Sequence, residues 1–234
     1  NIDEKTGDWR SRTAALRDNP FHEAVVRAAQ RVGPAFALNV IVGWDNRILG
    51  AVAGDPIESH LVACLRYDKI FRAPIETRRP LVLASCGGWP YDVSLYQAHK
   101  SIDNAFRAVE RGSTLILLAQ CEEGWGADTF VDWLSIGSLD EHRRRLTESF
   151  EVAGHTAYAL KWKATKCRML LVSDVLAEKV ECGEGPAWLR HEESSPFQLS
   201  IRSTLEDALT AADISGKVSG YVVPIAACVL PEYK

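Results

Sequence analysis

A strand, a helix and a second strand follow one another in the middle of the chain, and this order constrains the fold more than any other feature. Residues 81–85 and 114–120 are apolar runs of strand-like composition. Between them, residues 94–111 carry apolar side chains at helical spacing, and Gly112 is suited to ending a helix. Two strands joined by a helix pair in parallel, with a right-handed crossover. The sequence therefore predicts an α/β fold around a parallel sheet.

The rest of the chain adds elements before and after this unit. Apolar spacing, capping residues and turn residues mark each of them. The predicted elements are a helix from Asn19-Pro20 to Gly33-Pro34, strands over 36–42 and 48–53 joined by a turn at Asp45-Asn46, a helix from Asp55-Pro56 that Pro74 ends, helices near 129–134, 139–150 and 156–166, a strand over 169–172 that extends the parallel sheet, a loop over 183–196, a helix over 204–212 capped by Ser203, and a final strand over 220–230.

Composition and charge argue against two classes of partner. With 47% hydrophobic and 25% charged residues in a length of 234, the chain resembles an average folded globular protein. Its longest apolar run, residues 225–230, is far too short to cross a bilayer, so no membrane role is expected. The formal net charge is -4 and there is no basic stripe to contact a phosphate backbone, so nucleic acid is not an expected partner.

The cysteines and histidines indicate reduced thiols and no self-contained metal site. The six cysteines are widely separated, form no C-x-x-C pair and lie mostly in apolar stretches, where a free cysteine behaves as a small hydrophobic residue. We therefore expect a cytoplasmic protein. The six histidines show neither H-x-x-x-H nor H-E-x-x-H spacing, so no metal ligand is predicted in this chain.

The candidate ligand site follows from the predicted sheet. Ligands of parallel sheets bind outside the carboxyl ends of the strands, where helix N-termini offer unpaired N–H groups. Residues 86–90, residues 121–126 and the segment that begins at Ser173 occupy such positions. On the helix after the first of them, Gln97 and Lys100 share a face, so an amide and an ammonium point together. Such a pair suits a small anion that carries a hydroxyl group.

Other interpretations of the same residues stay open. Ser94-x-x-Gln97 is also a capping-box pattern, and from the residues alone capping explains Gln97 better than binding does. His99 lies on a different helical face, while His155, near the start of a later helix, could point into the same crevice. Cys86 has the position of an acyl-transfer nucleophile at a strand end, although no catalytic triad accompanies it.

Several segments, taken in order, resemble the nickel-dependent lactate racemase family. The most specific is Tyr96-Gln97-Ala98-His99-Lys100, which resembles the Tyr-Gln-Ala-x-Lys motif of that family. The match covers most of the chain and corresponds to the C-terminal half of family members. The other matching segments are Gly87-Gly88-Trp89-Pro90-Tyr91-Asp92, which resembles Gly-Gly-(Phe/Tyr)-Pro-x-Asp, together with Asn19-Pro20, residues 39–42, residues 53–60, Asp103-Asn104-Ala105 and residues 121–126.

The resemblance implies a two-domain enzyme with its active site in the cleft between the domains. A nickel-pincer nucleotide would take up a hydride from the alpha carbon of a 2-hydroxyacid and return it to either face. Lys100 and Gln97 correspond to the residues that hold the substrate carboxylate and hydroxyl, and Tyr96 lines the cofactor pocket. The remaining residues that the resemblance places in the substrate and cofactor pocket are His155, Gly87, Gly88, Glu123 and Gly124.

The rest of that machinery has no match in this chain. The paired catalytic histidines, the cofactor-bearing lysine and the nickel-ligating histidine of the family belong to its N-terminal half. The missing N-terminal domain is therefore an expected partner, and the isolated chain is expected to be inactive. His155 aligns with a tryptophan of lactate-specific members, so the identity of the hydroxyacid stays open, as does the role of His60.

The same correspondence gives domain limits. The expected fold class is α/β, with a parallel-sheet βαβ C-terminal domain plus the end of a second, N-terminal α/β domain. Residues 1–55 would end the N-terminal domain, to which residues 217–234 return. Residues 76–200 would form the substrate domain, between interdomain helices at 56–75 and 201–216. A non-catalytic α/β module that binds a small carboxylate is the alternative function.

Overall fold

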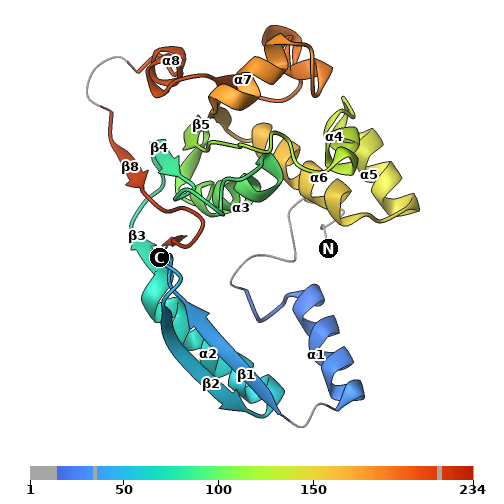
Figure 1. Cartoon of the computed structure of the whole chain (residues 1–234), viewed down its shortest axis with the longest axis vertical. Helices are drawn as coiled ribbons and strands as arrows, with labels where there is room; N and C mark the ends of the chain where they lie inside the picture. Colours follow the sequence, from blue (N-terminus) through green and yellow to red (C-terminus); the bar gives the residue numbers. More distant parts are fainter. Residues whose placement is uncertain (1–14, 34–35, 215–217, 234) are drawn as a thin grey trace. The chain divides into compact units, whose positions relative to one another are not determined.

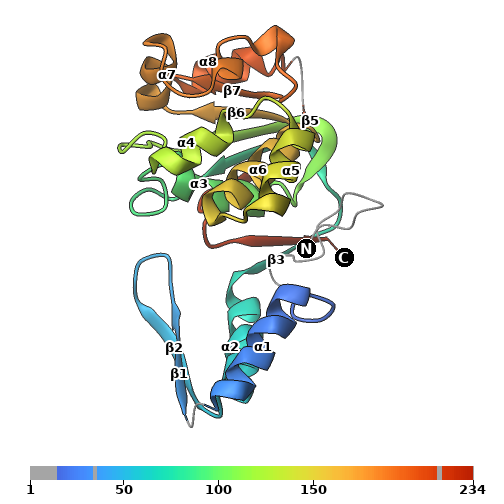
Figure 2. The same cartoon turned by 90° about the vertical axis from the view of Figure 1, so that its right-hand side faces the viewer.

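The computed structural model describes residues 15–33, 36–214 and 218–233. The chain divides into two compact units, Asn1–Ile70 and Phe71–Lys234, and Figures 1 and 2 label most of their elements from two directions. The helices are α1 (Pro20–Val32), α2 (Pro56–Phe71), α3 (Leu95–Ala105), α4 (Asp128–Leu134), α5 (Leu139–Glu148), α6 (Val152–Ala164), α7 (Asp174–Glu181) and α8 (Leu205–Ala211), with short 3-10 turns at Ala187–Leu189 and Glu192–Ser194. The strands are β1 (Ala37–Val42), β2 (Ile48–Gly54), β3 (Arg72–Ile75), β4 (Arg79–Ser85), β5 (Val109–Leu118), β6 (Arg168–Val172), β7 (Leu199–Arg202), β8 (Gly220–Val223) and β9 (Leu230–Tyr233).

The first unit confirms the predicted helix, hairpin and helix. The side chain of Asn19 caps α1 by accepting hydrogen bonds from two backbone N–H groups, and Gly33 ends the helix at a φ of 63°. Strands β1 and β2 pair in antiparallel register. Their turn contains Asn46 at a φ of 61°, a conformation that asparagine tolerates. Pro34, residues 1–14 and residues 215–217, on which parts of the sequence predictions fall, lie outside the described residues.

The β1–β2 hairpin leaves large apolar side chains uncovered. Leu38 is 64% exposed and Ile48 is 70% exposed, whereas Ile41 is the buried residue of the two strands. Asn39 Nδ2 donates to Ser59 Oγ on α2 at 3.0 Å, which ties one strand to the helix. A two-stranded hairpin with so little buried surface is marginally stable by itself.

The second unit is built on a five-stranded sheet in the order β7-β6-β5-β4-β8, and every pair in it is parallel. This confirms the predicted α/β fold with a parallel sheet. From β4 the chain steps outward to β7 and then returns by way of α8 to place β8 on the other side of β4. Strands β3 and β9 form a separate parallel pair.

The helices cover the two faces of this sheet. Ala98, Ile102 and Ala105 of α3 pack with residues of α6 and of the strands in the main hydrophobic core, and Figure 2 shows α3, α5 and α6 in front of the sheet. The opposite face is covered by α8, whose Ala208 packs on Ile116 and Leu170. Within the described residues, no helix is long and apolar enough to cross a membrane.

The helix predicted over 94–111 is wrong at its carboxyl end. α3 stops at Ala105, and β5 already begins at Val109, which pairs with Arg79 of β4. Gly112 lies inside β5 at a φ of 78° and does not end a helix. Pairing between strands that are distant in sequence outweighs local helix propensity here.

The carboxyl-terminal part of the chain needs further corrections. The predicted strand over 220–230 is two strands, of which β8 pairs with β4 and β9 pairs with β3. The N-cap of α8 is Thr204 and not Ser203, because Thr204 Oγ1 accepts the hydrogen bond from the Asp207 N–H group. Helix α7 and strand β7 occupy segments for which no element is predicted. The domain limits inferred from the sequence stay a prediction.

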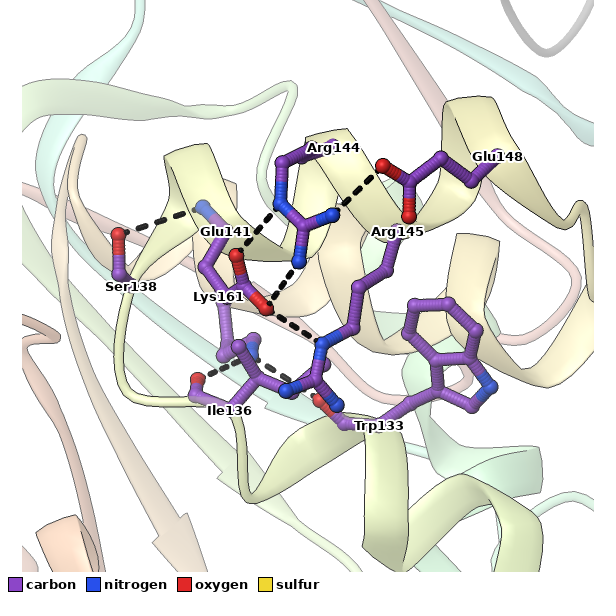
Figure 3. Close-up of polar contacts among 8 residues, drawn as sticks. All are labelled: Trp133, Ile136, Ser138, Glu141, Arg144, Arg145, Glu148 and Lys161. Carbon is purple, nitrogen blue, oxygen red and sulfur yellow. Dashed lines mark hydrogen bonds and ion pairs between the residues drawn. The ribbon is translucent and has the colours of Figure 1, made fainter.

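Lys161 of α6 is completely buried, and this lysine stabilises the end of α4. Its Nζ donates to the carbonyl of Trp133 at 3.1 Å and to that of Ile136 at 2.6 Å. Figure 3 shows the Lys161 side chain reaching these carbonyls beneath the Glu141 and Arg144 ion pairs of α5. A cation at the last carbonyls of a helix also interacts favourably with the helix dipole. Burial lowers the pKa of Lys161 to about 7.

The low pKa of Lys161 predicts a pH-dependent stability. The ordinary value is 10.5, so between pH 7 and 10.5 the unfolded chain binds more protons than the folded chain, and the free energy of unfolding rises with pH. Lys161→Met should reduce this slope by up to about 1.4 kcal/mol per pH unit. Urea unfolding between pH 7 and 9.5 measures it, and the exposed Lys69→Met is the control that should keep the slope. An identical slope in Lys161→Met and the unchanged chain would contradict the lowered pKa of Lys161.

Candidate functional site

Hydrogen bonds tie the loops at the carboxyl edge of the sheet to one another. Asp92 follows β4, and its Oδ2 accepts a hydrogen bond from the Gln120 N–H group at 3.2 Å. The backbone carbonyl of Asp92 accepts from Cys121 at 2.8 Å. Ser173 Oγ, after β6, donates to the Gln120 carbonyl at 2.7 Å. The three loops selected from the sequence thus form one connected layer.

The start of α3 is bonded to this layer. The Leu95 N–H group donates to the Gly124 carbonyl at 2.9 Å, and the Tyr96 N–H group donates to the Trp125 carbonyl at 3.1 Å. The expectation of unpaired N–H groups at this helix start is therefore wrong. The capping-box interpretation is also wrong, because the Ser94 side chain makes no capping hydrogen bond.

Gln97 and Lys100 contact each other on the exposed side of α3. Lys100 Nζ donates to Gln97 Oε1 at 2.8 Å, as expected for two residues that share a face. Since the amide oxygen accepts from the ammonium, the Nε2 group of Gln97 is left to donate elsewhere. The pair therefore offers donors from two side chains, and one of them carries a positive charge.

The glycines of the expected pocket allow close approach of neighbouring groups. An added Cβ at Gly126 would lie 2.8 Å from the Cβ of Tyr96, and one at Gly124 would lie 2.8 Å from Cε of Lys179. An added Cβ at Gly87 would lie 2.8 Å from Ile225 Cγ2. The first of these three distances places the 121–126 loop directly against the first turn of α3.

The remaining pocket candidates have different surroundings. The Tyr96 ring is half-buried and lies edge-on to Phe130, with 5.3 Å between the centroids. A Cβ added at Gly88 would meet open space. Glu123 is exposed, and its N–H group donates to the Val93 carbonyl at 2.8 Å. The structure therefore places Gly124 and Tyr96 at the start of α3, whereas Glu123 is exposed and Gly88 borders open space.

The two candidate histidines lie on neighbouring helices, His99 on α3 and His155 on α6. The His99 ring contacts the carbonyl of Tyr96 through Nδ1. Its pKa is lowered chiefly by burial. His155 on α6 is half-buried beside Phe150, with 6.2 Å between ring centroids, and its pKa is lowered chiefly by burial as well. Both imidazoles are therefore held toward the neutral form.

Cys86 does not support the acyl-transfer alternative. The side chain is fully buried, and burial raises the pKa of its thiol to about 12. The reactive form of cysteine is the thiolate, which is scarce at neutral pH when the pKa is this high. All six cysteines are described by the structure, and none of them forms a disulfide.

Two side chains outside the predicted site residues also shape this region. The Asp92 carboxylate is buried and joins two loops, and the Trp125 indole Nε1 is buried without a hydrogen-bond partner among the described residues. The motif resemblance includes Asp92, but its contact with Gln120 joins residues that are far apart in sequence, so residue spacing does not reveal that contact. Throughout the described ranges, no three His, Cys, Asp or Glu side chains gather in a way that could hold a metal ion.

Comparison with known families assigns the chain. Residues 76–229, well over half of the chain, match the family model described as the lactate racemase C-terminal domain. The chain belongs to this family. The match contains α3 with Gln97 and Lys100 and the loops that hold its first turn. The resemblance stated from the sequence motifs is confirmed.

Two curated relatives are lactate racemases. The one from Thermoanaerobacterium thermosaccharolyticum is 32% identical over 124 residues, which make up 53% of this chain and 29% of that protein. The one from Lactiplantibacillus plantarum is 27% identical over 163 residues, which make up 70% of this chain and 38% of that protein. The matched regions thus span well under half of the length of these relatives.

Solved structures share the fold. The lactate racemase apoprotein from Thermoanaerobacterium thermosaccharolyticum superposes with a TM-score of 0.78 at 22% identity and covers 93% of this chain, which is 51% of that chain. A protein from Thermotoga maritima superposes with a TM-score of 0.62 at 12% identity, over 92% of this chain and 54% of its own. At these identities the likeness shows the α/β fold.

The contact between Gly126 and Tyr96 predicts that this loop does not tolerate a larger residue. Gly126 has a φ of 100°, and an alanine there would be strained and would press on the first turn of α3. Gly126→Ala should therefore lower the free energy of unfolding by about 1–3 kcal/mol. Urea unfolding measures it. Gly137→Ala is the control, because a Cβ at Gly137 meets open space, and an equal loss in both variants would contradict the contact.

Proposed function

We propose that this chain holds the carboxylate and hydroxyl of a 2-hydroxyacid, as the C-terminal part of a 2-hydroxyacid racemase or epimerase. The observation that carries the proposal is the contact between Lys100 Nζ and Gln97 Oε1 at 2.8 Å on the exposed side of α3. Membership of the lactate racemase C-terminal domain family supports it. The activity of the whole protein is part of the proposal, since the chain spans about half of the solved racemase chain.

The chemistry of the pair suits this substrate class. An ammonium and an amide N–H group can both donate to a carboxylate, and a charged donor makes the stronger hydrogen bond. Because Lys100 already fixes the amide oxygen of Gln97, the amide is oriented before a ligand arrives. While the carboxylate is held in place, only the configuration at the alpha carbon of the substrate changes. Tyr96, anchored by Gly126 and Phe130, would form a wall of the same pocket.

A nickel-pincer nucleotide, which the motif resemblance implies, would supply hydride transfer at the alpha carbon. The described residues do not fit the metal part of this group, since no three of their His, Cys, Asp or Glu side chains gather suitably. The proposal therefore assigns no metal ligand to them. It gives this chain the tasks of binding and orienting the substrate. His155, Gly87, Gly88, Glu123 and Gly124 remain proposed pocket residues.

Exposed apolar residues in the first unit support a further protein partner. The β1–β2 hairpin leaves Leu38, Val40 and Ile48 largely exposed, although a hairpin of this size needs additional packing for stability. In the proposal this surface is covered by the N-terminal domain of the racemase. The proposal further states that the isolated chain does not interconvert hydroxyacid enantiomers.

A second candidate is a non-catalytic module that binds a small carboxylate. It is favoured because Gln97 and Lys100 both belong to α3, so their contact needs no residue from another segment. Racemisation by the full-length, cofactor-loaded protein separates the two candidates. Interconversion of the enantiomers of a 2-hydroxyacid supports the first, and binding without interconversion supports the second.

Calorimetric titration of the chain with lactate and other 2-hydroxyacids tests the shared claim. Lys100→Ala should lower the affinity at least tenfold, because a charge-assisted hydrogen bond of about 1.5–3 kcal/mol is lost. Gln97→Ala should lower it less, since the lost donor is neutral. Lys69→Ala, an exposed lysine of α2, is the control and should bind as the unchanged chain does. Equal affinity in Lys100→Ala and the unchanged chain would exclude Lys100 from the site.

A further inference from the structure

An ion pair joins the substrate helix α3 to α6. It is formed by Asp103 and Lys163, whose side chains are 36% and 10% exposed. Lys163 Nζ also donates to the Ala159 carbonyl at 3.3 Å within α6. The charge of Asp103 is thus neutralised by a nearly buried cation that belongs to another helix.

Without this cation, Asp103 would have another partner within reach. Lys100 precedes Asp103 by three residues on α3, and side chains at this spacing are neighbours on a helix surface. Opposite charges at this spacing attract each other. A contact between Asp103 and Lys100 would compete with an external carboxylate for the ammonium.

The His99 ring shows that these charges share one locality. The pKa of His99 is lowered, mainly by burial. Among the nearby charges, Asp103 acts to raise this pKa, whereas Lys163 and Lys100 act to lower it. All three charges therefore lie near one imidazole. On α6, His155 is influenced by the same ion pair, because after burial the next causes of its pKa shift are Lys163 and Asp103.

We propose that Lys163 is a positioning residue, which pairs with Asp103 and so keeps the Lys100 ammonium available to a substrate carboxylate. This inference rests on the proposed function, because it concerns the same anion site. It accounts for the observed pairing, in which Lys100 contacts Gln97 while Asp103 contacts Lys163. Lys163 does not touch the substrate in this arrangement and acts only through Asp103.

Lys163→Met tests the proposal, because methionine keeps the aliphatic bulk of the side chain and removes its charge. Asp103 should then pair with Lys100, and the affinity for lactate, measured by calorimetry, should fall by up to about fivefold, the upper limit for an exposed ion pair. The double variant Lys163→Met/Asp103→Asn should restore the affinity to within about twofold, because the competing carboxylate is gone. Lys166→Met is the matched control. It removes a lysine that lies just after the same helix, over the Trp162 ring, and should leave the affinity unchanged.

A second measurement reports on Lys100 without any ligand. In protein labelled with 13C-lysine, the Cε–Hε signal of Lys100, assigned with Lys100→Ala, should move in Lys163→Met and return in the double variant. If the unchanged chain binds no 2-hydroxyacid while this signal behaves as described, the proposed function fails and the competition by Asp103 stands. Unchanged lactate affinity and an unchanged signal in Lys163→Met would overturn the inference.

The design also separates positioning from a purely structural role. A structural role predicts that the double variant binds as weakly as Lys163→Met or more weakly, and that result would overturn the inference. Asp103→Asn alone covers the case in which Lys163→Met does not fold. It removes the competitor directly and should bind lactate at least as tightly as the unchanged chain, and a fivefold weaker affinity would overturn the inference.

Discussion

Two backbone hydrogen bonds, from the N–H groups of Leu95 and Tyr96 to the carbonyls of Gly124 and Trp125, hold the start of α3 against the 121–126 loop. They take up donors that a helix start would otherwise offer to an anion. In the proposed function, ligand binding relies on the side chains of Gln97 and Lys100, which contact each other. The parallel pairing of β4 with β5 brings the loops that follow these strands to one edge of the sheet, because both strands end there.

Some features that depend on neighbouring residues are predicted correctly from the sequence, although the caps expected at Ser203 and Ser94 are not. The Asn19 cap and the turn at Asn46 follow from residue chemistry that acts over a few positions. The exact limits of elements that pair with distant partners are predicted less well. Gly112 has the sequence context of a helix end but lies in β5, because strand pairing with β4 begins at Val109. The buried Lys161 likewise depends on carbonyls of another helix, which no spacing reveals.

The candidate site shows the same division. The spacing of three residues predicts that Gln97 and Lys100 share a face, and the structure shows their contact. From the residues alone, however, a capping box explains Gln97 better, and only the geometry of Ser94 removes that explanation. The Asp103–Lys163 ion pair joins two helices and is invisible in the sequence. The family motif supplies the proposed substrate class, because local chemistry indicates no more than a small anion.

The central claim is that Gln97 and Lys100 hold the carboxylate of a 2-hydroxyacid on the exposed side of α3. A crystal structure of the chain soaked with lactate tests it most directly. The account predicts lactate with its carboxylate within hydrogen-bond distance of Lys100 Nζ and Gln97 Nε2. Lactate bound elsewhere, for example in the cavity of about 210 Å³ beside Arg202 and Ser203, with an unchanged Lys100–Gln97 contact, would contradict it.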